Sequence, residues 1–205
     1  MPIRLVSLLV LLLSACTNYA DPASIRAPQT ASERAAYDSV YHDVERIRFR
    51  LSISAGYLCP SGCPIKLYLG TANGIGAFAS RESVWLPVPM AQEMRTDDER
   101  ALVLAHEWAH VLLKDPGGFN EAREMRAECL GTMLAKRAGF DPLRGADLHR
   151  RMARREAGEQ ILLIAMGMMG GGTSVGWSDR VSMIERAAAT AADKAAMASV
   201  CGVRW

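Results

Sequence analysis

His106, Glu107 and His110 form the strongest candidate for a reactive site in this sequence. They lie in LVLAHEWAHVLL, residues 102–113, where the two histidines are four positions apart and the glutamate follows the first. On an α-helix, residues four apart differ by about 40° in direction, so both imidazoles can bind one metal ion. Glu107 projects in an adjacent direction and can reach a water molecule on that metal. The pattern predicts a zinc site with Glu107 as general base.

The residues around this trio are uncharged, which predicts a buried helix that carries one acid and two bases. Burying such a set without a partner costs free energy, and a metal ion is the simplest partner for all three groups. The alternative is a core helix whose histidines hydrogen-bond to the backbone. We favour the metal site.

A third protein ligand must complete a catalytic zinc site of this kind. Glu124 is the preferred candidate, because a turn at 116–120 can fold the next helix back beside the first. Glu121, very close to that turn, and His149, which has no partner at a ligand spacing, are the alternatives. Glu128 lies one turn beyond Glu124 and is expected to hydrogen-bond a ligand histidine, fixing which ring nitrogen meets the metal.

The two helices of this site have recognisable ends. Thr96 and Glu99 match a Thr-x-x-Glu capping box, which starts a helix that ends near Lys114, before Asp-Pro-Gly-Gly. Asn120 can cap the next helix, whose apolar residues keep helical spacing until Gly139. The sequence therefore predicts two helices joined by a short turn.

The remaining elements are predicted from the period of the apolar residues. A helix is expected from Ser32 to about Arg46, followed by a half-buried strand over 47–53, where apolar and polar residues alternate. Short strands are also expected at 65–69, 75–79 and 83–88, and an alanine-rich helix at about 178–199.

Segment 161–172 is rich in methionine and glycine. Its apolar run of nine residues, 161–169, is too short to cross a bilayer, which needs roughly 20. It is typical of a buried helix end that leads into a glycine loop, and a lid over the site is the alternative.

Composition limits the function classes. The 205 residues, half of them hydrophobic, suffice for one core and one domain. A formal charge of +2, from 24 Lys and Arg against 22 Asp and Glu, gives no sign of a nucleic-acid partner.

The N-terminus predicts export and a lipid anchor. Residues 1–15 form a signal peptide with an apolar run, and Leu-Ser-Ala-Cys at its end resembles a bacterial lipobox, which implies lipid attachment at Cys16. Thr17 rather than Asp follows, which in Gram-negative lipoproteins implies the outer membrane. Residues 16–31 are then a lipidated, flexible tether, and 32–205 the folded domain.

Export permits disulfides, and four cysteines remain besides Cys16. Cys59 and Cys63 enclose Pro-Ser-Gly, so we predict that they bond to each other. Cys129 and Cys201 are expected to lie near enough to each other to pair. A four-thiolate zinc site is disfavoured, because only one closely spaced pair is present.

The motifs taken together resemble the M48 peptidases, gluzincin metalloproteases that include bacterial lipoproteins of outer-membrane quality control. The resemblance covers roughly residues 65–142: NGIGAF at 73–78, HEWAH, Glu-Met-Arg-Ala-Glu at 124–128, Leu-Gly, and Ala-Gly-Phe-Asp-Pro at 138–142. Departures are Glu128 for the usual aspartate, a shorter gap between His110 and Glu124, and Arg180 where many members have a histidine.

This resemblance implies zinc bound by His106, His110 and Glu124, with Glu107 as general base. It also implies that the backbone at Gly76, Ala77 and Phe78 receives a polypeptide substrate as an added strand.

The overall expectation is a small α+β, zincin-like domain, with an active-site helix pair and a short antiparallel or mixed sheet. Its expected function is zinc-dependent endopeptidase cleavage of misfolded or unassembled proteins in the bacterial cell envelope, with the chain lipid-anchored to the outer membrane and facing the periplasm. The alternative is a catalytically silent, zinc-stabilised lipoprotein that binds envelope proteins without cutting them.

Overall fold

The chain folds as a mostly helical α+β domain with one small sheet, as the sequence predicts. The computed structural model describes residues 25–59, 65–72, 76–80, 82–116, 120–165 and 176–203, with only the backbone of 156 and 158–165. The predicted signal peptide, the lipidation site Cys16 and most of the tether lie outside these residues. Within them, no helix combines the length and the apolar character needed to cross a membrane.

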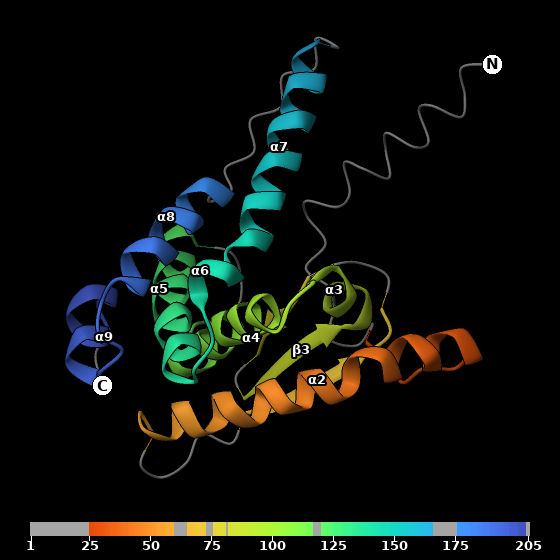
Figure 1. The fold of residues 1–205 in the computed structure, drawn as a ribbon, viewed down its shortest axis with the longest axis horizontal. Coiled ribbons are helices and arrows are strands. Elements are labelled where there is room, and N and C mark those ends of the chain that lie inside the picture. The colour runs from red at the N-terminus through yellow and green to blue at the C-terminus, as the bar shows by residue number, and fades with distance from the viewer. Residues whose placement is uncertain are drawn as a thin grey trace.

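The sheet contains three strands in the order β1-β3-β2 (Figure 1). β1 (Lys66–Gly70) runs parallel to β3 (Ser83–Pro87), and β2 (Phe78–Ala79) runs antiparallel to β3. The predictions of strands at 65–69 and 83–88 are confirmed. The predicted strand at 75–79 shortens to β2, and Ile75 lies outside the described residues. β2 is therefore a short edge strand.

The first described residues also contact the sheet. Arg26 and Thr71 exchange backbone hydrogen bonds of 3.0 and 2.8 Å just beyond the end of β1. Thr30 then caps α2 (Ala31–Gly56), and Glu33 returns the bond to complete a capping box. The end of the predicted tether is therefore paired with the domain.

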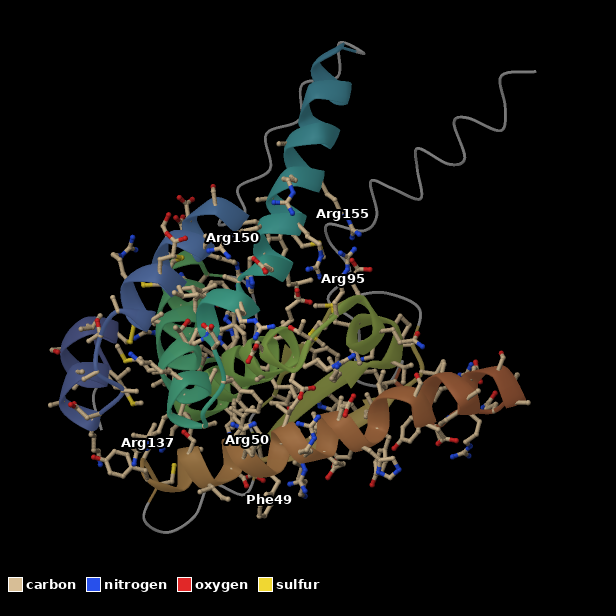
Figure 2. The ribbon with its side chains drawn as sticks, viewed as in Figure 1. Phe49, Arg50, Arg95, Arg137, Arg150 and Arg155 are labelled. Atoms are coloured by element: carbon tan, nitrogen blue, oxygen red, sulfur yellow. A yellow bond between two sulfur atoms is a disulfide. The ribbon has the colours of Figure 1, made fainter. Side chains whose placement is uncertain are left out.

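The predicted strand over 47–53 is wrong, because α2 continues through it as one helix. The residues buried by α2 are at 40, 44, 47, 51, 54 and 55, a spacing of three and four that matches a helical face. Phe49 and Ile53, which would have shared a strand face with Leu51, are 61% and 64% exposed. Figure 2 shows Phe49 directed away from the body of the molecule. The helical period across the whole element outweighs the local alternation.

The site-bearing helices begin and end where the turn signals predict. α3 (Val88–Glu93) is followed by α4 (Asp97–Leu112) and α5 (Glu121–Arg137). Thr96 and Asn120 cap α4 and α5 by accepting hydrogen bonds from the third residue beyond each. The capping box is only half formed at α4: the Glu99 carboxylate accepts from the Arg95 backbone at 2.7 Å instead of from Thr96.

The C-terminal part contains α6 (Pro142–Gly145), α7 (Asp147–Ala165), α8 (Trp177–Ala188) and α9 (Lys194–Cys201). α7 extends away from the rest of the domain (Figure 1). Its backbone enters the methionine- and glycine-rich segment as far as Ala165, and both readings of that segment rest on side chains and residues outside those described.

The prediction of a single helix at 178–199 is wrong, because the helix is interrupted between α8 and α9. The Lys136 ammonium donates to the carbonyls of Ala188 and Thr190 at 2.7 and 2.9 Å. Asp193 then accepts from the Ala196 backbone and starts the new helix. A partly buried lysine from α5 therefore ends α8, and a new N-cap starts α9.

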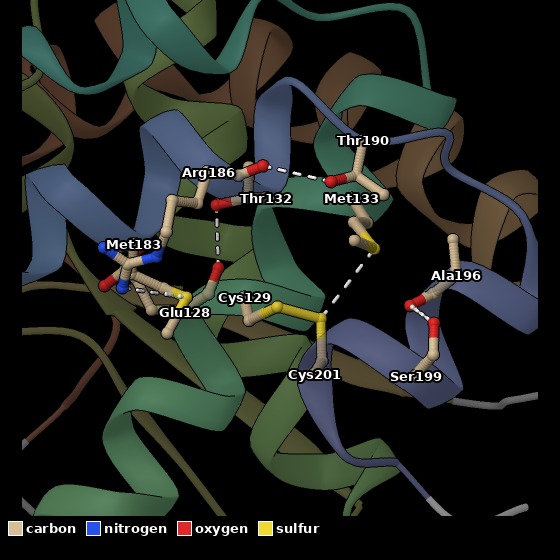
Figure 3. Close-up of a disulfide and its surroundings, with 10 residues drawn as sticks. All are labelled: Glu128, Cys129, Thr132, Met133, Met183, Arg186, Thr190, Ala196, Ser199 and Cys201. Atoms are coloured by element: carbon tan, nitrogen blue, oxygen red, sulfur yellow. Dashed lines mark hydrogen bonds between the residues drawn. A yellow bond between two sulfur atoms is a disulfide. The ribbon is translucent and has the colours of Figure 1, made fainter.

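The break directs α9 back onto α5, where a disulfide joins them (Figure 3). The predicted pair of Cys129 and Cys201 is confirmed, with Cα atoms 5.5 Å apart and both residues buried. Cys59 is also disulfide-bonded. Its predicted partner Cys63 lies outside the described residues, so that pairing stays a prediction.

Candidate metal centre

His106, His110 and Glu124 come together as a set of metal-ligand donors. One ligand atom from each lies within 4.8 Å of the others. The two histidine Nε2 atoms are 3.1 Å apart. Glu124 Oε2 lies 3.4 Å from His106 Nε2, and Glu124 Oε1 lies 3.5 Å from His110 Nε2. Two imidazoles and one carboxylate form the three-ligand set that catalytic zinc sites use. Among the described residues, no other group of this kind occurs.

The close approach of α4 and α5 brings these donors together. A Cβ at Gly131 would lie 2.7 Å from both the nitrogen and the Cα of His106, so a larger residue does not fit there without a backbone shift. Glycine at 131 therefore lets α5 pass directly against the α4 backbone at the ligand position. Glu124, two turns earlier on α5, then faces the two histidines.

Glu107 lies in the same cavity as the donor set. The cavity has a volume of about 360 Å³, and its lining includes His106, Glu107, His110 and Glu124. Burial raises the pKa of the Glu107 carboxyl above its usual value. A carboxylate whose pKa is moved toward neutrality is well suited to accept a proton and release it again.

The edge strand forms one wall of this cavity. Gly76, Ala77 and Phe78, the predicted substrate-binding residues, line it together with Ala79 and Ser80. Because β2 is at an edge of the sheet, it offers backbone groups to a further strand. The three predicted residues therefore lie where an extended polypeptide can pair beside Glu107.

Glu128 lies beside His106, but the predicted hydrogen bond between them is replaced by a close contact without hydrogen-bond geometry. Its Oε2 is 3.3 Å from His106 Nδ1, 3.0 Å from an Arg180 guanidinium nitrogen and 3.5 Å from His149 Nε2. Arg180 also donates to Glu124 at 2.8 Å and so bridges the two acids. Within the described residues, the buried atoms Glu128 Oε1 and His106 Nδ1 have no hydrogen-bond partner of good geometry.

Asp115 takes the corresponding place beside His110. Its Oδ2 is 2.9 Å from His110 Nδ1, and its Oδ1 is 3.5 Å from Arg126. The end of α4 sets this contact: Lys114 adopts φ 54°, and the backbone N–H of Asp115 donates to the carbonyl of His110 at 3.1 Å. The positive φ and this hydrogen bond are typical of a Schellman-type turn, which returns the chain toward the histidine.

The charges of the site favour a cation. Burial opposes a charge on His106, but the charge of Glu128 and close contacts with Glu124 and Glu128 raise the pKa of His106 to about 10. Burial also opposes charge on Glu124 and Glu128. Contacts with His106 and His110 nevertheless hold the pKa of Glu124 well below its usual range, and His149 and His106 do the same for Glu128. A bound proton thus occupies a place that suits a metal ion.

Neither of the two alternative third ligands joins the donor set. Glu121 is exposed at the first residue of α5. His149 is buried and lines the cavity, with its ring 5.3 Å from that of Trp177, but its Nε2 faces Glu128 and it is not part of the donor set. Glu124 is the candidate that the geometry brings to both histidines.

Sequence reasoning missed two contacts of this site. The sequence pattern assigns Asp115 only to the helix-ending turn, although its position five residues after His110 places it within reach of the ring once the helix closes. Arg180 departs from the family pattern, and the sequence gives it no role. Its ion pairs with Glu124 and Glu128 span 56 and 52 residues, and no local signal marks them.

Comparison with known proteins agrees with the site. The family model described as "Peptidase family M48" matches residues 61–199, well over half of the chain. No curated protein and no solved structure matches. The matched range contains the helix pair, the edge strand, the three donors and Arg180. The chain is therefore a member of peptidase family M48.

Proposed function

We propose that this protein is a zinc-dependent endopeptidase. The observation that carries the proposal is that three zinc-type donors, a buried glutamate and an edge strand share one cavity. Membership of a metallopeptidase family supports the same activity. His106, His110 and Glu124 would hold the metal.

The residues of the cavity have different roles in the proposed hydrolysis. When bound, zinc supplies Lewis-acid stabilisation of the charge that develops on the scissile carbonyl, and it acidifies water. Glu107 accepts the proton of the attacking water and delivers it to the leaving amine. The backbone of β2 holds the substrate extended, so that the scissile bond lies beside Glu107.

A Glu107→Gln variant tests this proposal, because it leaves all three metal donors in place. We expect one zinc per chain in both proteins, and cleavage of an unfolded protein that falls by roughly 100-fold or more in the variant. A chelator should abolish cleavage by the parent. Glu121→Gln, an exposed glutamate on the same helix pair, is the matched control and should keep full activity.

Two results would reject the peptidase function. Unchanged cleavage by Glu107→Gln would assign the activity to a contaminant. Zinc binding without any cleavage by the parent would favour the alternative function, a zinc-stabilised module that binds envelope proteins.

We further propose that the substrates are misfolded or unassembled proteins of the cell envelope. Pairing with an edge strand requires an extended backbone, which an unfolded chain presents and a folded domain does not. The test is to compare one envelope protein in folded and denatured form. Cleavage of the two forms at equal rates would contradict this selectivity.

The proposed location is the periplasmic face of the outer membrane, through a lipid on Cys16. The apolar leader and the Leu-Ser-Ala-Cys sequence support this anchor. Cys16→Ser should release the protein from the membrane fraction or leave it unprocessed. Unchanged membrane fractionation of that variant would exclude the lipid as the anchor.

A further inference from the structure

One end of the cavity has an apolar wall that the proposed chemistry does not use. Met90, Val103, Leu148 and Met152 line it, from α3, α4 and α7. Met90, Val103 and Leu148 are 7%, 8% and 2% exposed, and Met152 is half-buried. These four residues are called the apolar wall below.

The apolar wall lies toward the N-terminal end of α4. Val103 is three and four residues before His106 and Glu107, so it is one helical turn away on the same face. Asp115 and Pro116, which also line the cavity, follow the C-terminal end of α4. The lining of the cavity therefore includes residues on both sides of Glu107 along α4, and Val103 of the apolar wall lies on the N-terminal side.

A buried ion pair holds the three elements of the wall together. Arg151 on α7 contacts Glu99, in the first turn of α4, at 2.5 and 3.0 Å, and it donates to the carbonyl of Glu93, at the end of α3, at 3.2 Å. The Glu99 side chain is 2% exposed. Leu148 and Met152 are three residues before and one residue after Arg151 on α7, so this pair fixes the wall beside the site.

We infer that the apolar wall is a specificity subsite, which accepts a large hydrophobic side chain next to the scissile bond of the substrate. The inference rests on the peptidase function proposed above. A substrate strand paired with β2 passes Glu107, so a side chain on one side of the cleaved bond faces the wall. Leucine, methionine and phenylalanine are the expected occupants, since two flexible methionines let the wall adapt to several shapes.

This choice of side chain also fits the biological substrate proposed above. Large hydrophobic residues are buried in folded proteins and become accessible when a protein is misfolded. The subsite needs an accessible hydrophobic side chain, and the strand edge needs an extended backbone. An unfolded chain meets both requirements, so both favour unfolded substrates.

The first experiment maps cleavage by the zinc-loaded protein in a mixture of peptides of defined sequence. We expect leucine, methionine or phenylalanine to be enriched at one fixed position beside the cleaved bond. The preference in kcat/KM over alanine or aspartate should be about 10- to 100-fold, as expected for burying such a side chain.

The second experiment changes the wall itself. Met152→Glu places a carboxylate on its half-buried member, so the preference for leucine should be lost and lysine or arginine should gain at the same position. Leu143→Glu is the matched control: Leu143 is 46% exposed, lies on α6 and does not line the cavity. This control should leave the cleavage profile unchanged.

Met152→Ala protects the test against misfolding of the charged variant. It removes apolar volume and should move the preference toward phenylalanine and tryptophan. Zinc content and thermal unfolding identify variants that remain folded. In a Glu107→Gln background, binding of a leucine peptide, followed by calorimetry, should weaken about 10- to 100-fold on adding Met152→Glu.

The outcomes separate this inference from the peptidase proposal. Cleavage without an enriched position, or enrichment that Met152→Glu and Met152→Ala leave unchanged, would overturn the subsite and leave the peptidase function intact. Absence of any cleavage by the zinc-loaded parent would overturn both.

Discussion

Each histidine of the site lies beside a carboxylate, and the two carboxylates are in different settings. Behind His106, Glu128 is fully buried, and one of its oxygens serves Arg180, His106 and His149. Beside His110, Asp115 makes a 2.9 Å hydrogen bond, and its cationic partner Arg126 is 44% exposed. We call these the inner and the outer carboxylate.

The difference separates two ways of fixing a ligand. The inner carboxylate is shared among three elements, α4, α7 and α8, so its loss should disturb the packing of the domain as well as the metal. The outer carboxylate belongs to the turn that ends α4 and touches its histidine directly. Its loss should change the metal site and leave the domain largely intact.

Glu128→Ala should therefore have the largest effect on stability. Removing one member of a buried ionic cluster leaves Arg180 and the two histidines short of a counter-charge, which costs roughly 3–5 kcal/mol. Asp115→Ala should cost about 1 kcal/mol or less, because its partner Arg126 is solvated. Chemical denaturation of the metal-free domain measures both. Equal losses would contradict the distinction between inner and outer carboxylates.

Zinc binding should depend on pH through the inner histidine. In the metal-free domain the pKa of His106 is raised to about 10, so a proton must leave before the metal binds. Apparent zinc affinity should increase roughly tenfold per pH unit, or about 100-fold from pH 7 to pH 9. Chelator competition at each pH measures it. Glu128→Gln, which removes the main group that raises this pKa, should flatten the dependence.

The stability of the metal-free domain should change in the opposite direction. A raised histidine pKa means that the protonated form of His106 stabilises the fold. That contribution is complete below the unfolded value near 6.5 and is lost as pH rises through about 10. Denaturation midpoints of the metal-free domain should therefore fall over the range in which zinc affinity rises. Midpoints that rise with pH in this range would show that His106 binds no extra proton.

Asp115→Ala should weaken zinc binding by about 10- to 100-fold, the usual effect of losing a carboxylate that orients a ligand histidine. Asp115→Asn keeps an acceptor for His110 Nδ1 and should give an intermediate affinity. Asp147→Asn, an exposed aspartate on α7, is the control. If Asp115→Ala binds zinc as tightly as this control, Asp115 does not orient His110.

The smallest expected effect concerns the turn that carries the outer carboxylate. Lys114 is exposed and adopts φ 54°, a conformation that favours glycine. Lys114→Gly should stabilise the domain by up to about 1 kcal/mol and leave zinc affinity unchanged, because the turn geometry is preserved. Thermal unfolding and zinc titration check the two halves. A destabilised variant would show that the lysine side chain contributes to the turn.

Features that depend on neighbouring residues can be predicted from the sequence of this protein. His106, Glu107 and His110 share one helical face because of their spacing, and Thr96 and Asn120 start the two helices because their side chains satisfy free backbone N–H groups. The strands at 66–70 and 83–87 follow from short β-favouring runs. Each of these features depends on residues that are close together in the sequence.

Local alternation was insufficient where a longer pattern competed. The predicted strand at 47–53 had the right period over seven residues, but the helical face of α2 continues through it from Val40 to Ala55. The break after α8 was missed for a different reason: its carbonyls are satisfied by Lys136, a residue from α5.

The residues that complete the site depend on how the helices pack in three dimensions. It chose Glu124 over Glu121 and His149, because Gly131 lets α5 lie against α4 at His106 and aligns one face of α5 with the histidines. It brought Arg180 to two acids more than 50 residues away. These contacts depend on the angle and distance between packed helices, which residue spacing along a single helix does not encode.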